Sequence, residues 1–506
     1  MEQTRADSNE SESQLEAWTV APLNMPPDAR GLRLIGVIGP GTILLGLSIG
    51  SGEWLLGPAA FVQYGPTLLW VTTAAVILQT VLNTELVRYT MYTGEPIFAG
   101  FMRTKPAPAF WAIFYSLLAF LQVGWPAWAG TAAGAIFYLF IGRLAGANDA
   151  DAVYQIGVAT FLMCVFILLF GGRIERTLEI LNWILVVFIF TGLIGLSALF
   201  VAPAGWLAGL AGLIGFDLNA RAFNFLPTGA DWSLIGAFAA YSGAGGIVNL
   251  MLSGWARDKG FGMGAVVGYI PAAVGSQRVH LAHPGSVFPI NATNLKNWRA
   301  WWRIAQFDQW GIFGIGALVC MLLTAVLYIE FIQPGKDIRG LGIAAELANA
   351  MATRGGVMMT YLVALLGAWI LFKTQLDILD GMVRAVTDIL WTGSARVRAW
   401  RGGDVRVVYY AVLAVVIAWG MIALRLTQPL VLLELGANIS GIVFVIAGLH
   451  VLYLNTTLLP VELRPPLWRR LGLVALSGFY GIFVWLWLMG GFIPDPAKGF
   501  VFRFLR

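Results

Sequence analysis

Apolar residues fall in runs of about 20 along most of the chain, long enough for an α-helix to cross the hydrocarbon core of a bilayer. Short polar connections separate these runs. Eleven helical spans are predicted, at residues 33–59, 65–91, 108–141, 152–171, 176–201, 232–255, 309–332, 356–392, 405–425, 428–457 and 468–491. The pattern therefore predicts an all-α integral membrane protein with eleven transmembrane helices.

Two glycine-rich stretches interrupt the apolar pattern, one in the first span and one in the sixth. The first consists of Gly50, Ser51, Gly52 and Glu53, and the second of Ser242, Gly243, Ala244, Gly245 and Gly246. Backbone polar groups at a helix break inside a membrane need partners from protein or solute, so such paired breaks indicate a transporter's binding site. Each break opens a group of five spans, and an odd number makes the two groups opposite in orientation, which predicts a 5+5 inverted repeat.

The expected organisation follows from these spans. Residues 1–28 are polar and are expected to form a disordered cytoplasmic tail. The first repeat covers 29–201, an extracellular connection 202–231, the second repeat 232–457 with a cytoplasmic loop at 256–308, and 458–506 holds the eleventh span and the C-terminus. In that loop, Trp298, Trp301 and Trp302 alternate with Arg299 and Arg303, which suits a short helix lying at the headgroup level.

Charge distribution sets the expected topology. The chain is 58% hydrophobic and only 12% charged, and its net charge of +5 comes from basic residues spread over alternate connections. The positive-inside rule then places the N-terminus in the cytoplasm and the C-terminus outside, for a multi-pass protein of the plasma (inner) membrane. A nucleic-acid partner is not expected, because no basic patch forms. Cys164 and Cys320 both lie in apolar spans and predict neither a disulfide nor a zinc site.

Glu53 is the sharpest candidate for a functional side chain. A carboxylate beside a helix break at mid-membrane is costly unless it meets a cation, a proton or a solute. It is therefore predicted to bind a substrate or a metal ion. The alternative is structural: Glu53 would cap the second half-helix, where the positive end of the helix dipole favours a negative charge.

The second break offers a different chemistry. Its glycines free backbone carbonyls, while neighbouring side chains supply neutral oxygens. The predicted binding residues here are Ala240, Tyr241, Ser242, Gly243 and Asn249. The alternative for the glycines is a packing notch against another helix.

The eighth span carries a polar stripe. Its charged residues recur every three or four positions, which places them on one helix face: Lys373, Asp377, Asp380, Arg384 and Asp388. They are predicted to form either a ladder of neighbouring ion pairs at the cytoplasmic end of the span, or an inner vestibule or proton path. Glu85 in span two is a further candidate for that path.

No catalytic motif accompanies these features. Residues 46–50 match the spelling Gly-x-Ser-x-Gly, but that motif needs a strand-turn-helix context and an apolar span lacks it. The chain is thus not expected to be an enzyme or to hold a cofactor.

Several motifs resemble the natural-resistance-associated macrophage protein (Nramp) family of divalent-metal transporters. The resemblance runs through residues 39–41 (Gly-Pro-Gly), 63–70 (Gln-Tyr-Gly-Pro-Thr-Leu-Leu-Trp) and 92–94 (Tyr-Thr-Gly), and continues more weakly at 130–132, 176–179 and 236–237. The chain is therefore interpreted as a divergent relative. The resemblance implies a LeuT-like fold of eleven spans with broken helices 1 and 6, alternating access and proton-linked metal uptake.

The departures from the family pattern fall at the site itself. Where the family has Asp-Pro-Gly-Asn, this chain has Gly50, Ser51, Gly52 and Glu53, so the ligand aspartate becomes glycine and the asparagine becomes Glu53. The family's Met-Pro-His in the sixth span is Ala240, Tyr241 and Ser242, and the acidic residue of span three is missing from residues 124–128. Loss of the thioether disfavours soft metals.

These observations predict a secondary transporter that imports a divalent cation, a hard ion such as Mg²⁺ or Mn²⁺, with Glu53 as the metal-binding side chain. The alternative is a transporter of the same fold for a small organic solute, a carboxylate or an amino acid, bound by the amides of residues 50–52. A remote alternative is a membrane sensor. The expected partners are the substrate and the lipid bilayer; no nucleic acid is expected to bind.

Overall fold

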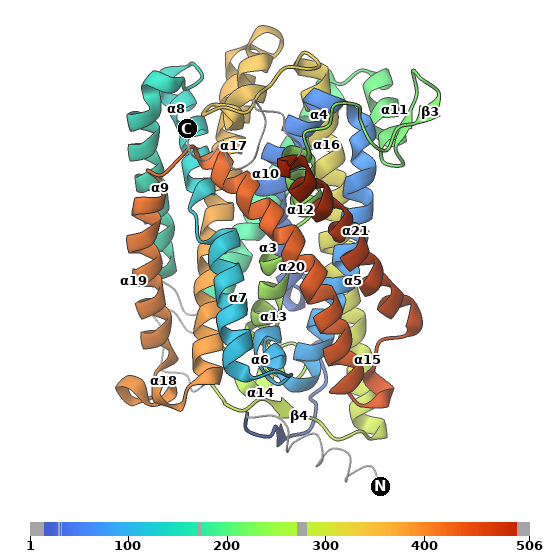
Figure 1. Ribbon diagram of the computed structural model, residues 1–506, viewed down its shortest axis with the longest axis vertical. Coiled ribbons are helices and arrows are strands. Elements are labelled where there is room, and N and C mark those ends of the chain that lie inside the picture. The colour runs from blue at the N-terminus through green and yellow to red at the C-terminus, as the bar shows by residue number, and fades with distance from the viewer. Residues whose placement is uncertain (1–14, 29–30, 32, 170–173, 271–280, 493–506) are drawn as a thin grey trace.

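Long apolar segments fold as helices here because a helix pairs its backbone polar groups within the segment itself. The computed structural model describes residues 15–28, 31, 33–169, 174–270 and 281–492, which form an elongated bundle of helices running roughly side by side (Figure 1). Residues 1–14 of the predicted tail, 271–280 of the predicted loop and 493–506 lie outside the described residues.

The first half of the chain builds the first five spans. Its elements are β1 (Thr19–Val20), α2 (Arg33–Val37), α3 (Pro40–Ser48), η1 (Ile49–Leu56), α4 (Gly57–Tyr64), η2 (Pro66–Leu68), α5 (Leu69–Thr93), α6 (Ile97–Met102), α7 (Pro108–Val123), α8 (Ala127–Ile141), η3 (Ala147–Asp149), α9 (Ala150–Leu169), α10 (Ile174–Phe200) and α11 (Pro203–Gly212).

The second half builds the other six spans. Its elements are β2 (Phe216–Asp217), β3 (Ala222–Phe223), α12 (Trp232–Tyr241), α13 (Ile247–Lys259), α14 (Gly264–Val267), β4 (Ser286–Val287), α15 (Ala292–Gln306), η4 (Phe307–Gly314), α16 (Ile315–Phe331), η5 (Ile343–Ala345), α17 (Glu346–Gly393), α18 (Ala395–Ala399), η6 (Trp400–Gly402), α19 (Val405–Ala423), α20 (Pro429–Thr457), η7 (Val461–Leu463) and α21 (Leu467–Phe492).

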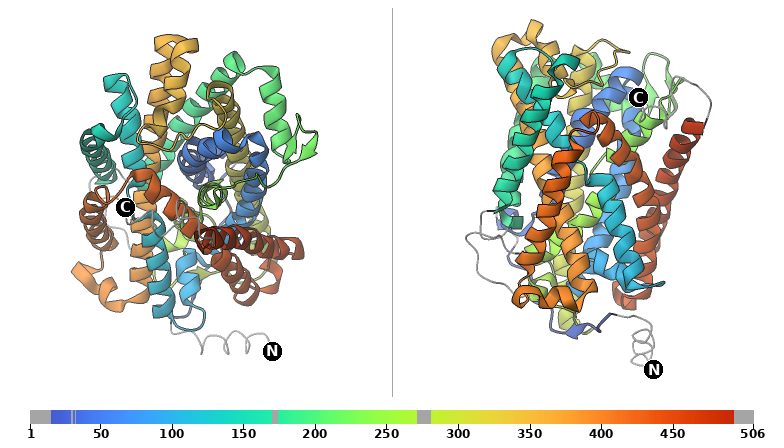
Figure 2. Two further views of the ribbon diagram at one scale, coloured as in Figure 1. Left: turned by 45° about the horizontal axis from the view of Figure 1, so that its top comes forward. Right: turned by 60° about the vertical axis from the view of Figure 1, so that its left-hand side comes forward.

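The span count agrees with the sequence prediction. Ten helices of the described residues are long and apolar enough to cross a membrane, and the broken pair α12 and α13 supplies the sixth span between them. The first span is buried along its whole apolar window, whereas the Val405–Ala423 window is only 28% buried. Span one therefore lies inside the bundle, and spans such as the ninth form its wall (Figure 2).

The first helix differs in form from the predicted break. Residues Pro40–Tyr64 are helical throughout, and the glycine stretch lies in η1, eight residues of wide π-helical turns. Such a stretch keeps backbone hydrogen bonds that an unwound segment would lose, because each amide reaches five residues back instead of four. The first span is thus widened at residues 49–56, whereas the sixth is truly interrupted.

The segment before the first span is ordered, which contradicts the prediction of a disordered tail for residues 15–28. Strand β1 pairs in parallel with β4, so that Thr19 faces Ser286 and Val20 faces Val287. Leu23 is buried and its backbone is held by two side chains of α15, Asn294 and Asn297. We call residues 15–28 the N-terminal strap.

The structure also differs from the prediction of a short interfacial helix. Residues 292–306 form α15, which continues through the π-helical η4 into α16 as one helix of 40 residues. Trp298 and Trp301 are buried in the bundle, whereas Arg299 and Arg303 are exposed. The tryptophans therefore serve packing, and the segment is the extension of span seven.

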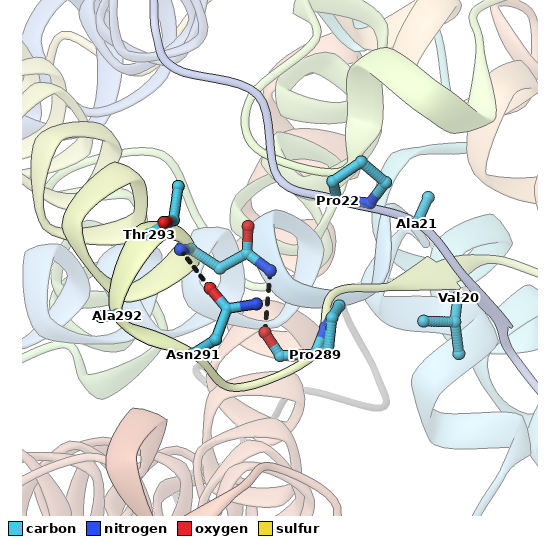
Figure 3. A pocket seen from close by; sticks show the side chains of 8 residues that line it. Val20, Ala21, Pro22, Pro289, Asn291, Ala292 and Thr293 are labelled. Atoms are coloured by element: carbon cyan, nitrogen blue, oxygen red, sulfur yellow. Dashed lines mark hydrogen bonds between the residues drawn. The ribbon is translucent and has the colours of Figure 1, made fainter.

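A shallow cavity of about 560 Å³ lies between the strap and the start of α15. Its lining residues are Val20, Ala21, Pro22, Pro289, Asn291, Ala292, Thr293 and Asn294 (Figure 3). Asn291 Oδ1 accepts a hydrogen bond from the Asn294 amide, which caps α15 (Figure 3). The cavity belongs to the β1 end of the molecule and not to either glycine-rich stretch.

Candidate functional site

The glycine-rich stretch of span one is packed on several sides by other spans. A side chain at Gly50 would overlap Thr374 of α17, and one at Gly52 would overlap the carbonyl of Tyr241 at the end of α12. Ser51 Oγ accepts a hydrogen bond of 2.9 Å from Trp128 Nε1 of α8. The predicted residues Gly50, Ser51 and Gly52 therefore lie where spans one, three, six and eight meet.

Glu53 is fully buried at this meeting point. Ser48 Oγ donates a hydrogen bond of 3.2 Å to Glu53 Oε1. Glu53 Oε2 has no hydrogen-bond partner among the described residues, although it is buried. The thiol of Cys320 on α16 lies within electrostatic range of the carboxylate. A buried carboxylate oxygen without a donor carries a large desolvation cost, which a cation or a proton would offset.

The second glycine-rich stretch separates α12 from α13 by a true break. Gly243, Gly245 and Gly246 have φ angles of 105°, 100° and 45°, which residues other than glycine rarely adopt. This backbone ends one helix and starts the next within the bundle. The structure thus confirms the interruption of helix 6 at the predicted residues.

Two glutamine side chains supply the partners that this break requires. Gln79 of α5 accepts from the Ala244 amide and donates to the Ser242 carbonyl, both at 2.9 Å. Gln122 of α7 accepts from the Ile247 amide and donates to the Gly245 carbonyl, also both at 2.9 Å. Neither residue is among the candidates predicted from the sequence, although an amide side chain inside an otherwise apolar span is a usable signal.

The other predicted residues of the second stretch divide into two groups. Ala240 and Tyr241 are both buried. Tyr241 lies beside the first stretch, with its carbonyl against Gly52 and its ring 6.1 Å from that of Trp128. Ser242 and Asn249 turn to span two instead: Ser242 Oγ lies 3.1 Å from Thr72 Oγ1, and Asn249 Nδ2 donates to Asn83 Oδ1 at 2.8 Å. Asn249 is therefore engaged in packing between α13 and α5.

The polar stripe of α17 is buried and splits into two clusters. Near the glycine-rich stretch, Lys373 pairs with Asp377, and Asn182 of α10 donates to Asp377 at 3.2 Å. Lys373 lies against Gly46 of span one. These contacts confirm the predicted pairing at four-residue spacing for the first two members of the stripe.

The second cluster joins the stripe to span six. Arg384 pairs with Asp380 at 3.0 Å and with Asp258 of α13. Asp388 pairs with Arg257 of α13 at 2.5 Å, not with Arg384. The predicted ladder within one helix is thus incomplete, because α13 supplies charges that the spacing within α17 cannot reveal.

Glu85 lies in a cluster of its own. Arg88 donates to it at 2.7 Å, Arg469 of α21 at 3.2 Å and Asn455 of α20 at 3.1 Å. These partners come from spans two, ten and eleven. The contacts favour a structural role in holding span eleven to the repeat.

The donor set for a metal ion is sparse. Among the residues that the structure describes, no group of three or more histidine, cysteine, aspartate or glutamate side chains could hold a metal ion. Glu53 is the acidic residue of the first stretch. The hydroxyl of Ser48 contacts its carboxylate, and that of Ser51 belongs to the same stretch and accepts from Trp128. Such a set suits a hard cation that keeps part of its hydration.

Comparison with solved structures shows the architecture to be a known one. Two point mutants of the manganese transporter from Eremococcus coleocola match over 96% of this chain and 92% of theirs, at 15% identity and a TM-score of 0.65. The same transporter in complex with an aromatic bis-isothiourea substituted compound matches with a TM-score of 0.62. This chain has their fold. The predicted all-α membrane fold is therefore confirmed.

No protein-family model matches the chain, and no match is found among curated proteins.

Proposed function

We propose that this protein is a secondary transporter that carries a divalent cation across the membrane by alternating access, with Glu53 as the charged ligand. The fold that it shares with manganese transporters supports this proposal. The observation that supports Glu53 as the ligand is its Oε2 atom, which is buried and has no hydrogen-bond partner among the described residues. A bound cation would supply the positive charge that compensates this carboxylate.

The backbone of the two stretches favours a cation over a solute carboxylate. In span one the amides of residues 50–52 lie within π-helical turns instead of pointing from the end of a half-helix. In span six the amides of Ala244 and Ile247 are bound by Gln79 and Gln122. Anion recognition at a helix break needs free amides, so the organic carboxylate alternative loses its main support.

The proposed ion is hard, Mg²⁺ or Mn²⁺. A single carboxylate with hydroxyl and carbonyl oxygens matches the preference of these ions for oxygen ligands. Cys320 on α16 adds a sulfur within electrostatic range of Glu53, and a thiol favours softer ions when it is ionised. Its burial among apolar residues instead makes it a small packing group.

Uptake of Mn²⁺ into proteoliposomes, with Mg²⁺ as competitor, tests the proposal. The parent protein is expected to show saturable uptake that Mg²⁺ suppresses. Glu53→Gln should reduce uptake at least about 100-fold, since removing one partner of a buried charge contact costs about 3–5 kcal/mol. Glu330→Gln is the matched control, because Glu330 lies at the end of α16 beside the exposed Arg354, and it should keep the parent's uptake.

Two outcomes would contradict the proposal in different ways. Full uptake by Glu53→Gln would remove Glu53 as the ligand while leaving metal transport in place. Absence of uptake above empty liposomes for the parent would reject the divalent cation and direct the search to small amines and carboxylates.

A further inference from the structure

The charge cluster between α13 and α17 is unbalanced. It contains two guanidiniums, Arg257 and Arg384, and three carboxylates, Asp258, Asp380 and Asp388. All five side chains are at most 3% exposed. When all are ionised, the cluster holds one more negative charge than positive. An uncompensated charge in such surroundings is strongly disfavoured, and uptake of a proton removes it.

The hydrogen bonds show which carboxylate is the least satisfied. Asp380 accepts from Arg384, from Tyr409 Oη at 2.8 Å and from Trp255 Nε1 at 3.1 Å. Asp258 accepts from both guanidiniums and from the Ile270 amide at 3.1 Å.

Asp388 has fewer donors. Within the described part of the chain, its one hydrogen-bond donor is Arg257 Nη1, at 2.5 Å. Donors stabilise an ionised carboxylate, so Asp388 is the member of the cluster on which the excess proton would reside.

A water-sized cavity adjoins Asp388. Its volume is about 20 Å³, and Asp388, Arg257, Glu95 and His283 line it. A buried water needs at least roughly 10–15 Å³ and two or more polar partners. Arg257 Nη2 is buried and, among the residues described, has no hydrogen-bond partner. The cavity thus has the size, the donor and the acceptor to hold one water against Asp388.

The other ionisable groups around the cavity lead from Asp388 to the surface at the β1 end. Burial alone raises the pKa of Glu95, but the Arg103 guanidinium lowers it to about 2, so Glu95 stays ionised. Burial lowers the pKa of His283, so its ring is neutral at pH 7 and takes up a proton only transiently; the side chain is partly exposed. His283 therefore connects the cavity to solvent as a proton acceptor.

We propose that Asp388 is the proton-binding carboxylate of an exchange site between spans six and eight, and that one water in the adjoining cavity passes the proton between Asp388 and His283. The site is separate from Glu53 and does not depend on the identity of the transported substrate. Only the coupling of this proton exchange to cation transport rests on the proposed function.

Proton exchange at Asp388 would act on the contact between the two spans. It changes the charge facing Arg257 by one unit, and Arg257 joins α13 to α17 together with the neighbouring pair of Asp258 and Arg384. Because α13 continues from the second glycine-rich break, the protonation state of Asp388 would bias how the half-helix after the break sits against span eight.

Infrared difference spectroscopy on the purified full-length protein tests the site without requiring transport. The parent at pH 7 is expected to show a carboxylic acid C=O band that Asp388→Asn removes and Asp388→Glu shifts. Asp388→Asn keeps an acceptor for Arg257 and balances the cluster, so it should fold. Glu330→Gln is the control and should leave the band unchanged. Glu53 and Asp308 are buried acids as well, so only the band that the Asp388 variants alter counts.

The water relay is tested by kinetics. After a pH jump, His283→Gln should keep the Asp388 band but slow its response at least about tenfold, because the acceptor beside the cavity is lost. A parent spectrum in which neither Asp388 variant alters a carboxylic acid band would overturn the proposal. An unchanged response rate in His283→Gln would overturn the relay. Neither result bears on Mn²⁺ uptake, so the two proposals can fail separately.

Discussion

At the scale of single residues, the site depends on the absence of side chains as much as on their chemistry. Gly50 and Gly52 let α17 and the end of α12 approach the backbone of span one directly. Glu53 can therefore lie buried where four spans meet, held on one oxygen by Ser48. The glycines that identify the stretch in the sequence are required for close packing, and the carboxylate beside them provides its charge.

Gly52→Ala tests this close approach. The added methyl group would overlap the Tyr241 carbonyl, so spans one and six must separate, which costs about 1–3 kcal/mol. We expect a lower melting temperature of the detergent-purified protein and loss of uptake. The matched control is Gly195→Ala on α10, where a methyl group has no atom within 4 Å. There the change should be neutral or stabilise by about 0.5–1 kcal/mol, and equal melting temperatures for both variants would contradict the argument.

Part of the site could be predicted at this scale. Glu53 and the glycines are conspicuous in an apolar span, and the spacing of four residues correctly paired Lys373 with Asp377. The partners of Asp388 could not be predicted, because Arg257 is distant in sequence and only the fold brings α13 beside α17. Gln79 and Gln122 were missed for the same reason, since their role depends on a break that lies in another span.

At the scale of elements, the N-terminal strap connects segments far apart in sequence. Besides pairing with β4, it brings Trp18 over the Arg103 guanidinium, at 4.6 Å from the ring centre. Glu16 accepts from Arg398 near the end of span eight at 3.1 Å. The strap therefore crosses the β1 end of the bundle and contacts the connections that follow spans two, six and eight (Figure 1).

Ala21→Pro tests whether strand pairing holds the strap. The Ala21 amide donates to the Val287 carbonyl at 3.0 Å, and proline removes that donor. We expect hydrogen exchange across residues 15–28 to become about tenfold faster, measured by mass spectrometry on the whole protein. Val20→Pro is the control: the amides of Thr19 and Ala21 point to β4, so that of Val20 points away. Similar exchange in both variants would show that side-chain contacts hold the strap instead.

The elements differ in how far the sequence could predict them. The spans are set by apolar length, which a single sequence contains. The strap was predicted to be disordered because residues 1–28 are polar, yet Leu23 is buried and its backbone is bound by α15. The wide turns of η1 and η4 carry no compositional signal separable from that of an ordinary helix, and tertiary packing selects them.

At the scale of the whole molecule, charged clusters close the bundle at both ends. Opposite the strap, Arg339 binds Asp231 at 2.9 Å, and Asp231 caps the start of α12. Glu434 of α20 lies 3.9 Å from the same guanidinium. At the β1 end, Arg257 and Arg384 join α13 to α17. Both halves of the broken sixth span are thus anchored by arginines, at opposite ends of the bundle.

Cys320 can report on this closure, because it is fully buried beside the first stretch. With Cys164→Ser as background, Cys320 is the only cysteine of the chain. An impermeant maleimide should label it slowly. Arg339→Gln should make labelling about tenfold faster when the maleimide is added on the side where Arg339 lies. Losing a partly buried ion pair shifts the free energy of opening by about 1–2 kcal/mol. The exposed Arg354→Gln is the control, and equal labelling in both would contradict this role of Arg339.

The wide turns of span one also determine what kind of movement that helix allows. A wide turn holds one more residue than an ordinary turn, so shifting it along the helix by one position keeps the backbone hydrogen bonds and turns the residues it passes by about 100°. Eight residues of such turns lie between α3 and α4. A shift of these turns by one position would therefore rotate Glu53 about the axis of span one, whereas a broken helix would change direction by bending.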